Sequence, residues 1–266
     1  MSDDPEFTLP AWSIRWLESC ASTSDELRLA ARSGAASGLV LATTCQSAGR
    51  GRRGHAWVSE PGEGLAFSAL WHAPIPADRL GWVALAAGVA TATAIEAQGA
   101  GAIQLKWPND LLHGGAKLGG ILVETVAGAA PPGHTAVSIG IGINLAGGDR
   151  LARSLGRAVT DLGACGERGG GGSGGALVEP QVLTAAILRA LDAWLRVLAA
   201  GEVVALQDAW SSRDALSGRA VSIEQGAHRL EGIACGLAPD GALQVRTPGG
   251  LQRVHAGEVS IGALAS

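Results

Sequence analysis

The stretch Gln46-Ser47-Ala48-Gly49-Arg50-Gly51-Arg52-Arg53-Gly54-His55-Ala56-Trp57 is the feature around which the rest of the chain is organised. Glycine frees the backbone and lets main-chain N–H groups approach a ligand closely, while arginine supplies forked donors that suit a carboxylate or phosphate. Ordering the segment 49–54 costs on the order of 6–12 kcal/mol of conformational entropy. Charge-assisted hydrogen bonds of roughly 1.5–3 kcal/mol each offset this cost only when a ligand is bound. The segment 49–54, here called the arginine loop, is therefore predicted to be mobile until it closes over an anion.

The arginine loop has two alternative interpretations. The loop matches the GxGxxG pattern of dinucleotide sites, but that pattern needs a helix directly after the glycines. The residues 55–59, followed by Glu60-Pro61-Gly62, instead have strand-and-turn chemistry. The second alternative is a basic loop that is solvated or contacts RNA. A net charge of −4 disfavours a general nucleic-acid binder, so the loop is a local positive feature on a mildly acidic protein.

Length and composition indicate one large globular domain followed by a small one, because the chain has 266 residues and is 47% hydrophobic. The segment 1–6 has no basic region followed by an apolar core, so no signal peptide is expected. The apolar stretch 83–95 is too short to span a bilayer. The four cysteines form no CxxC pair and are expected to be reduced thiols. These features together predict a cytoplasmic protein, and no residues are assigned to a metal.

Periodicity and turn chemistry predict the elements of the first half of the chain. Ser22-Thr23-Ser24 precede Asp25-Glu26, which predicts a helix from residue 25 to near Gly34. The serines either only cap this helix or also bind a polar ligand head with their spare hydroxyls. Strands are expected at 12–18, 39–44, 65–71, 104–106, 117–124 and 137–144, with a long helix at 77–98.

Two lysines stand beside unusual neighbours. Lys106-Trp107-Pro108-Asn109-Asp110 ends a strand in a turn, but a tryptophan between a lysine and an aspartate exceeds what a turn requires. Lys117 lies between two pairs of glycines and starts an apolar strand, so its tip is expected at the rim of the sheet. The glycines of the strand 137–144 indicate that a ligand approaches its backbone closely.

The second half begins with a segment, 151–163, that is expected to be irregular, and with a glycine-rich linker at 167–175. Pro180 opens a helix that Gly201 closes. Its core stripe is expected to be Leu183, Ile187, Leu191, Trp194 and Leu198. From about residue 217 short alternating strands with turns at Asp240-Gly241 and Gly249-Gly250 predict a small β-barrel. The expected domains are therefore 1–212 and 213–266.

Taken together, these elements resemble those of the biotin protein ligases, in the same order and spacing. The matching residues are Ser22-Thr23-Ser24, Gln46, Gly49 to Gly54, Trp57, Lys106 to Asp110, Lys117, Gly120-Ile121-Leu122 and Gly140 to Asn144. The resemblance implies an α+β catalytic domain, with a mixed sheet and flanking helices, related to lipoate ligases and class II tRNA synthetases. It also implies an SH3-like β-barrel at the C-terminus. No room precedes Trp12 for a winged-helix domain, so the monofunctional class is expected.

The implied activity is ATP-dependent formation of biotinyl-5'-AMP, followed by transfer of biotin to a lysine of a biotin carboxyl carrier protein domain of an acyl-CoA carboxylase. Mg²⁺ is expected to accompany ATP. The implied catalytic residues are Lys117, Arg52 and Asp110, with Asp110 as general base for the incoming amine. The implied biotin-binding residues are Ser22, Thr23, Ser24, Gln46, Arg50, Gly51, Arg52, Trp57, Lys117 and Gly120. The implied ATP-binding residues are Arg50, Arg52, Arg53, Trp57, Lys106, Asn109, Lys117 and Asn144.

The chain departs from the family pattern at two places. Family members often have Asp-Ser-Thr-Asn where this chain has Ala21-Ser22-Thr23-Ser24, so a serine replaces a longer donor near the biotin head. The segment after Asn144 lacks the tryptophan that some members stack on adenine. Two alternative functions stay open at this point: a lipoate or octanoate ligase on the same fold, and a non-catalytic nucleic-acid-binding protein.

Overall fold

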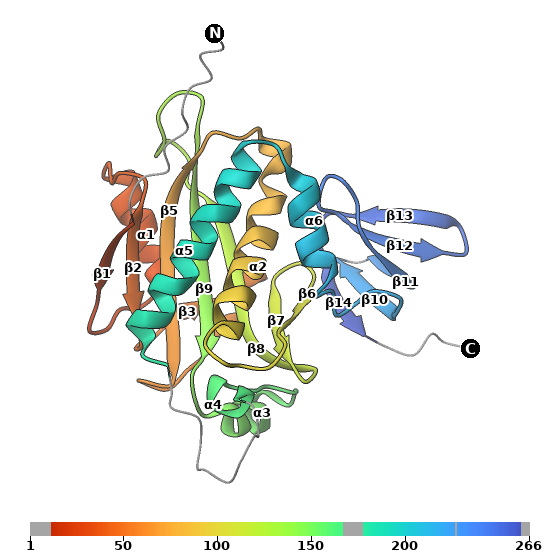
Figure 1. Ribbon diagram of the computed structural model, residues 1–266, viewed down its shortest axis with the longest axis horizontal. Helices are drawn as coiled ribbons and strands as arrows, with labels where there is room; N and C mark the ends of the chain where they lie inside the picture. The colour runs from red at the N-terminus through yellow and green to blue at the C-terminus, as the bar shows by residue number, and fades with distance from the viewer. Residues whose placement is uncertain (1–11, 167–177, 227, 262–266) are drawn as a thin grey trace.

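A seven-stranded mixed sheet forms the centre of the protein, in the order β1-β2-β5-β9-β8-β7-β6. The computed structural model in Figure 1 describes residues 12–166, 178–226 and 228–261. β1 runs parallel to β2, and the other neighbouring strands pair antiparallel. The strands are β1 (Ser13–Trp16), β2 (Leu39–Thr43), β5 (Gly64–Ala73), β9 (Thr135–Asn144), β8 (Ala116–Thr125), β7 (Asp110–His113) and β6 (Gln104–Lys106).

Helices cover the two faces of this sheet because successive strand residues point to opposite sides. On one face α2 (Gly81–Glu96) and α5 (Pro180–Ala199) pack side by side (Figure 1), over a core that contains Val40, Phe67 and Trp71. The opposite face carries α1 (Thr23–Arg32), which packs on a smaller cluster with Leu41 and Leu70. Ser22 is the N-cap of α1 and accepts a hydrogen bond from the Asp25 N–H. The strands and helices predicted for 12–144 are confirmed, apart from shifts of a few residues at their ends and a 3-10 turn at Ala77–Arg79 that separates residue 77 from α2.

The prediction of an irregular segment at 151–163 is wrong. Helix α3 (Gly148–Leu155) begins after Gly147 and ends at Gly156, and both of these glycines have the positive φ that favours glycine at helix boundaries. A short helix, α4 (Leu162–Cys165), follows, and the Asp161 side chain caps it by accepting from the Ala164 N–H. Apolar periodicity did not predict these two helices, because their segment contains many small residues. The expected linker at 167–175 lies outside the described residues.

The core stripe of α5 is as predicted except at one position. Leu183, Ile187, Leu191 and Leu198 are buried, whereas Trp194 is only partly buried and Leu195 takes the inner position. A further helix, α6 (Val203–Ser211), was not predicted; it buries Leu206 and Trp210. None of the helices within residues 12–166, 178–226 and 228–261 is both long and apolar enough to cross a membrane.

The C-terminal strands form a five-stranded antiparallel sheet in the order β13-β12-β11-β10-β14. They are β10 (Ala220–Gln225), β11 (His228–Leu237), β12 (Leu243–Thr247), β13 (Gly250–Val254) and β14 (Glu258–Ile261). The predicted turns at Gly241 and Gly250 are confirmed, and both glycines have positive φ. The sheet suits the expected SH3-like module, although among the described residues β13 and β14 remain separate edges and the sheet is not closed into a barrel.

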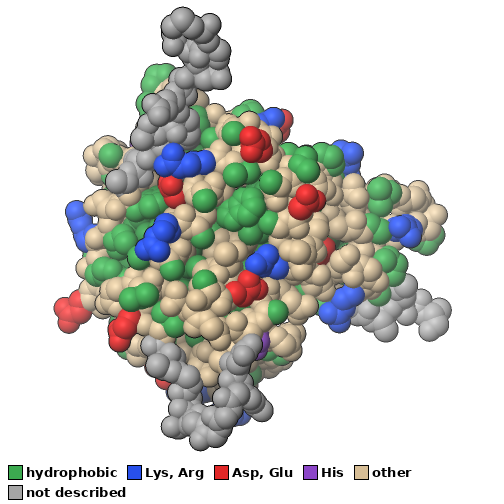
Figure 2. All heavy atoms as spheres, viewed as in Figure 1, with side chains coloured by type: hydrophobic (Ala, Val, Ile, Leu, Met, Phe, Trp, Pro, Cys, Tyr) green, Lys and Arg blue, Asp and Glu red, His purple; other side chains and the backbone are tan. Residues whose placement is uncertain are grey.

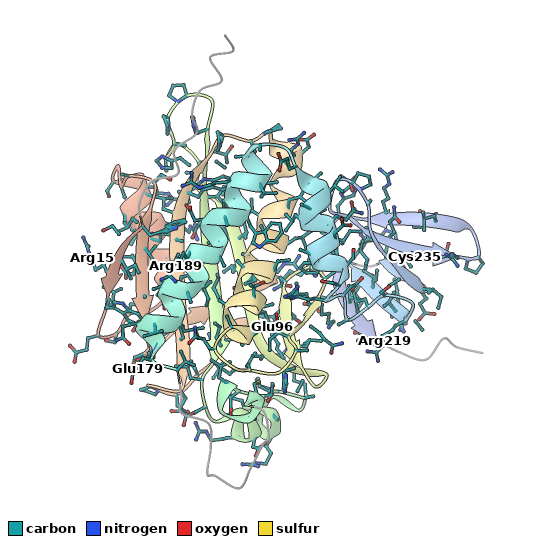
Figure 3. All side chains as sticks on the ribbon, in the orientation of Figure 1. Arg15, Glu96, Glu179, Arg189, Arg219 and Cys235 are labelled. Carbon is teal, nitrogen blue, oxygen red and sulfur yellow. The ribbon has the colours of Figure 1, made fainter. Side chains whose placement is uncertain are left out.

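Hydrogen bonds attach the C-terminal sheet to the rest of the protein. Trp107 Nε1 donates to the Gly241 carbonyl at 3.1 Å, and Trp82 Nε1 donates to the Pro239 carbonyl at 3.3 Å. Glu96, labelled in Figure 3 near the end of α2, accepts a hydrogen bond from Arg213 at 2.7 Å. The domain boundary that we propose, between residues 212 and 213, therefore lies in a segment that is itself fixed to the larger domain.

Candidate active site

A cavity of about 570 Å³ opens between the start of α1, the arginine loop, strands β8 and β9, and strand β14 of the C-terminal sheet. All but one of the residues predicted for the site line it. These are Ser22, Thr23, Ser24, Gln46, Arg50, Gly51, Arg52, Arg53, Trp57, Lys106, Asn109, Asp110, Lys117 and Gly120. Residues that lie up to about a hundred positions apart in sequence therefore meet in one place, which is what a ligand site requires.

One end of the cavity is lined by hydroxyl groups from the start of α1. Ser22, Thr23 and Ser24 are each buried. The Thr23 N–H donates to Gln46 Oε1 at 2.7 Å, which fixes the amide of Gln46 beside the hydroxyls. Thr23 Oγ1 and Ser24 Oγ also lie within hydrogen-bonding distance of the buried Ser68 Oγ. This end carries uncharged donors and acceptors, so it suits a polar, neutral head group.

The other end of the cavity carries the lysines of this chain, Lys106 and Lys117. Lys117 Nζ donates to Asp110 Oδ1 at 2.5 Å across the β7–β8 pair. Burial lowers the pKa of Lys106, and the nearby Asp110 carboxylate partly offsets this effect. The predicted position of Lys117 at the rim of the sheet is consistent with the partial exposure of its side chain. This end therefore suits an anion.

The arginine loop is a short hairpin between β3 (Gly49–Arg50) and β4 (Ala56–Trp57), with a 3-10 turn at Arg52–Gly54. Two acidic residues fix the side chain of Arg50, because its guanidinium donates to both carboxylate oxygens of Glu124 and to Asp25. Arg52 Nη1 donates to Asn109 Oδ1 at 3.2 Å, and burial lowers the pKa of Arg52. Of the loop arginines, Arg52 is thus tied to the Trp-Pro-Asn-Asp turn and Arg50 to the sheet and α1.

The indole of Trp57 lies directly on Gly142 of strand β9 and beside Gly120 of strand β8. A Cβ added at Gly142 would lie 2.7 Å from Trp57 Cε2, closer than real Cβ contacts, whereas one at Gly120 would be in ordinary contact at 3.6 Å. The sequence predicted that a ligand approaches the strand 137–144, whereas at Gly142 the group that lies against the backbone is the Trp57 ring. Trp57 Nε1 is buried and has no hydrogen-bond partner among the described residues.

The C-terminal sheet completes the cavity, which sequence reasoning did not foresee. His55 Nε2 lies 2.9 Å from Glu258 Oε1, and Arg53 Nη1 donates to the Glu224 carbonyl at 3.4 Å. The residues 257–260 line the cavity, as do Leu155 at the end of α3 and Arg157 just after it. About two hundred residues separate His55 from Glu258, and no spacing pattern links them.

Asn144 is the predicted site residue that does not line the cavity. Its Nδ2 donates to the carbonyls of Lys117, at 3.3 Å, and Thr160, at 3.0 Å. Lys117 and Thr160 are also joined by backbone bonds, since the Thr160 N–H donates to the Lys117 carbonyl. Asn144 thus ties the strand that carries Lys117 to the segment after α3. Within the described residues no group of three or more His, Cys, Asp or Glu is placed to hold a metal ion.

Comparison with known proteins agrees with this architecture. The Biotin/lipoate A/B protein ligase family model matches residues 16–144, and the Biotin protein ligase C terminal domain model matches residues 216–262. The fold resembles that of the biotin protein ligase from Aquifex aeolicus in complex with biotin and ATP. That structure has 23% sequence identity and a TM-score of 0.78, and the match covers 94% of this chain and 98% of that chain.

Two curated relatives extend the likeness over most of the sequence. The biotin–[acetyl-CoA-carboxylase] ligase of Paracoccus denitrificans is 32% identical over 82% of this chain and 88% of its own length. The bifunctional ligase/repressor BirA of Escherichia coli (strain K12) is 30% identical over 81% of this chain and 64% of its own length.

The mixed sheet, the two ligase family models that match it and the likeness to the Paracoccus ligase define the class of this protein as a ligase. The chain belongs to the biotin protein ligase family, as the identity to the Paracoccus ligase over most of both chains shows.

Proposed function

We propose that this chain activates biotin with ATP as biotinyl-5'-AMP and transfers it to one lysine of a biotin carboxyl carrier protein domain. The observation that carries the proposal is a single cavity in which the neutral hydroxyl end and the Lys117–Asp110 pair face a common space beneath the arginine loop. Such a cavity accepts a ligand with an uncharged polar head and an anionic tail, and biotin is such a molecule.

The chemistry requires cations at the second end. A carboxylate does not acylate an amine at neutral pH, so adenylation must first give it a good leaving group. That step brings the carboxylate against a triphosphate, and donors placed where charge develops in the transition state are worth several kcal/mol. Lys117 is the proposed bridge between the biotin carboxylate and the α-phosphate, with Arg52 closing over the intermediate and Lys106 and Arg53 nearer the nucleotide.

The biotin head is assigned to the hydroxyl end. We place the ureido group against Ser22, Thr23, Ser24 and Gln46, and the rest of biotin between Trp57 and Gly120. The nucleotide takes the space towards Asn109 and the C-terminal sheet. Arg50, because Glu124 and Asp25 hold it, acts by shaping the loop as much as by its charge. Asn144 acts from behind, by fixing the segment next to Lys117.

Transfer needs a base for the incoming lysine amine, and we assign this role to Asp110. Its carboxylate lines the cavity and is 20% exposed, so an amine entering from the mouth can reach it. Mg²⁺ bound to a nucleotide needs only one or two protein carboxylates, because the phosphates supply other ligands. Asp110 and Glu258 are the carboxylates that line the cavity, and Mg²⁺ would supply charge neutralisation at the phosphates.

The decisive experiment incubates the protein with biotin, ATP, Mg²⁺ and a carrier domain, and measures the intact mass of the carrier. We expect one biotin per carrier, no product without ATP, and no product when the carrier lysine is replaced by arginine. Lipoate and octanoate serve as parallel substrates. Transfer of lipoate or octanoate in preference to biotin would overturn the choice of substrate, and ATP-independent binding of RNA without pyrophosphate release would overturn the enzyme assignment.

A further inference from the structure

Ser68 is a buried residue that lies behind the hydroxyl end of the cavity without lining it. It stands in the middle of β5, opposite Gly140 of β9. Ser68 Oγ lies 2.9 Å from Thr23 Oγ1 and 3.1 Å from Ser24 Oγ. Gly140 leaves the room for this arrangement, since a Cβ there would come within 3.0 Å of Ser24 Oγ. The hydroxyls of Thr23 and Ser24, two of the three residues that line this end of the cavity, therefore share one buried partner.

The number of protons limits what the three hydroxyls can offer. A hydroxyl has one proton and two lone pairs. The row Thr23–Ser68–Ser24 contains two hydrogen bonds, which use two of its three protons. Because Ser68 can donate only once, it donates to one neighbour and accepts from the other. One cavity-facing hydroxyl then keeps a free proton, and the other presents only lone pairs.

A third arrangement exists but is costly. Thr23 and Ser24 can both donate to Ser68, and both then present lone pairs to the cavity. The Ser68 proton is left buried without an acceptor among the described residues, and an unsatisfied buried donor is unfavourable. An arrangement with two free donors is impossible while both bonds are kept. The row therefore favours a ligand that has one acceptor beside one donor.

We propose that Ser68 is a positioning residue that makes Thr23 and Ser24 a donor–acceptor pair for the cyclic urea of biotin. A urea has a carbonyl acceptor next to N–H donors, which is the pattern complementary to the favoured arrangements. The proposal rests on the proposed function, because it takes biotin as the ligand. It also gives a physical reason why a serine at position 24 is sufficient near the head group: Ser68 orients its short side chain.

The test compares Ser68→Ala with a matched control, Ser138→Ala. Ser138 is equally buried, lies on the neighbouring strand β9, does not line the cavity, and its Oγ has no partner among the described residues. Titration calorimetry measures the Kd of biotin and of 2-iminobiotin, in which a donor N–H group replaces the carbonyl acceptor. The KM for ATP is measured in parallel.

In Ser68→Ala the hydroxyls of Thr23 and Ser24 rotate independently, so the loss of preorganisation should raise the Kd of biotin about tenfold. The informative quantity is the ratio of the 2-iminobiotin Kd to the biotin Kd. This ratio should fall severalfold. In wild type, a ligand head that only donates needs Thr23 and Ser24 both to accept from it, which leaves the Ser68 proton unsatisfied, and Ser68→Ala has no such proton. The charge of 2-iminobiotin affects wild type and variant equally. The KM for ATP, and every constant of Ser138→Ala, should stay at wild-type values.

A general loosening of the site would raise the Kd of both ligands by the same factor and leave the ratio unchanged, and that result overturns the inference. In that case, biotin binding by wild type would still uphold the proposed function. Wild type that binds no biotin overturns both. Should Ser68→Ala fail to fold, Ser68→Cys replaces the hydroxyl by a slightly larger group that is a weaker donor, and its ratio should fall below that of wild type. A wild-type ratio in Ser68→Cys would then count against the inference.

Discussion

The ammonium group of Lys117 and the carboxylate of Asp110 form an ion pair across neighbouring strands, with Nζ 2.5 Å from Oδ1. Both side chains are only 20% exposed. Removing one partner of such a pair leaves the other charge partly buried and uncompensated. The two proposed catalytic residues are therefore coupled before any ligand binds, and a variant of one also changes the other.

Lys117→Ala should fold but lose adenylation. Removing one donor that stabilises the transition state costs about 10²–10³ in rate, and here a full charge is removed as well. Biotin-dependent pyrophosphate release measures the effect, and thermal unfolding checks the fold. Arg150→Ala is a suitable control, because Arg150 pairs with Glu63 at the surface and does not line the cavity. Near-wild-type pyrophosphate release by a folded Lys117→Ala would refute the role of this lysine.

The arginine loop should become more protected when biotin or its adenylate binds. The salt bridges of Arg50 already hold the base of the hairpin, so the change should concentrate at residues 51–55. Within this segment the Gly51 N–H donates to the His55 carbonyl, and the His55 N–H donates to the Arg52 carbonyl. Hydrogen exchange across residues 46–57, with and without biotin, measures the effect. Equal protection in both states would mean that the loop is ordered by the protein alone.

Arg52→Gly should make the adenylate but release it prematurely. The change removes the bond to Asn109 and adds chain entropy to the closed loop, and both effects favour opening. Because biotinyl-adenylate is a mixed anhydride, the variant should label albumin when no carrier domain is present. The readout is albumin-bound biotin alongside pyrophosphate release.

Arg53→Gly is the matched control for this experiment. It removes the same charge, but Arg53 is exposed and has no bond to Asn109, and its φ of 53° is one that glycine adopts without strain. Labelling of albumin by Arg53→Gly to the same extent would show that loop entropy, not the Arg52–Asn109 contact, retains the intermediate. Unlabelled albumin during continued turnover by Arg52→Gly would shift retention to Arg50, Arg53 or Trp57.

Gly142→Ala should displace the Trp57 ring from its place on strand β9. The new Cβ would lie 2.7–3.1 Å from three atoms of the indole, and the strand backbone has no room to retreat. We expect at least a tenfold loss in affinity for biotin and ATP, since the displaced ring enters the cavity. Gly81→Ala is the control, because nothing lies within 4 Å of its Cβ position. A Gly142→Ala protein with wild-type affinity would show that Trp57 does not depend on this glycine.

The sequence predicted the elements that carry the site better than the contacts within it. Apolar periodicity located α5, and nearly continuous apolar runs located α2 and the long strands β5 and β9, because these elements lie in the core. The helices α3 and α4 were missed, since their segment is rich in small and charged residues and its boundaries depend on two left-handed glycines. Local signals could not reveal that Glu258 and Arg157 reach the cavity, because only the assembled fold brings them there.

Individual side chains show the same limit. The charge of Arg50 predicts that this residue faces the ligand. In the fold Arg50 also pairs with Glu124 and Asp25, which lie on a strand and a helix distant from it in sequence. Ser68 has no distinguishing pattern in the sequence, because it is a serine in an apolar strand, and its importance comes from the two hydroxyls that α1 places beside it.

A basic patch for nucleic acid is not evident on the face shown in Figure 2, where charged side chains are scattered.

The position of the lysines has a consequence for the enzyme's own lifetime. Both of the chain's lysines, Lys106 and Lys117, line the cavity, and its other long cationic side chains are arginines. An arginine stays protonated at any physiological pH and is a poor nucleophile, so a surface without lysine offers an escaping mixed anhydride little to attack. We therefore expect little acylation of the protein's own side-chain amines by its product. A variant that releases the adenylate should label the amines of bystander proteins and its own α-amino group. The rest of its folded surface should stay unmodified, which is a consequence of its amino-acid composition.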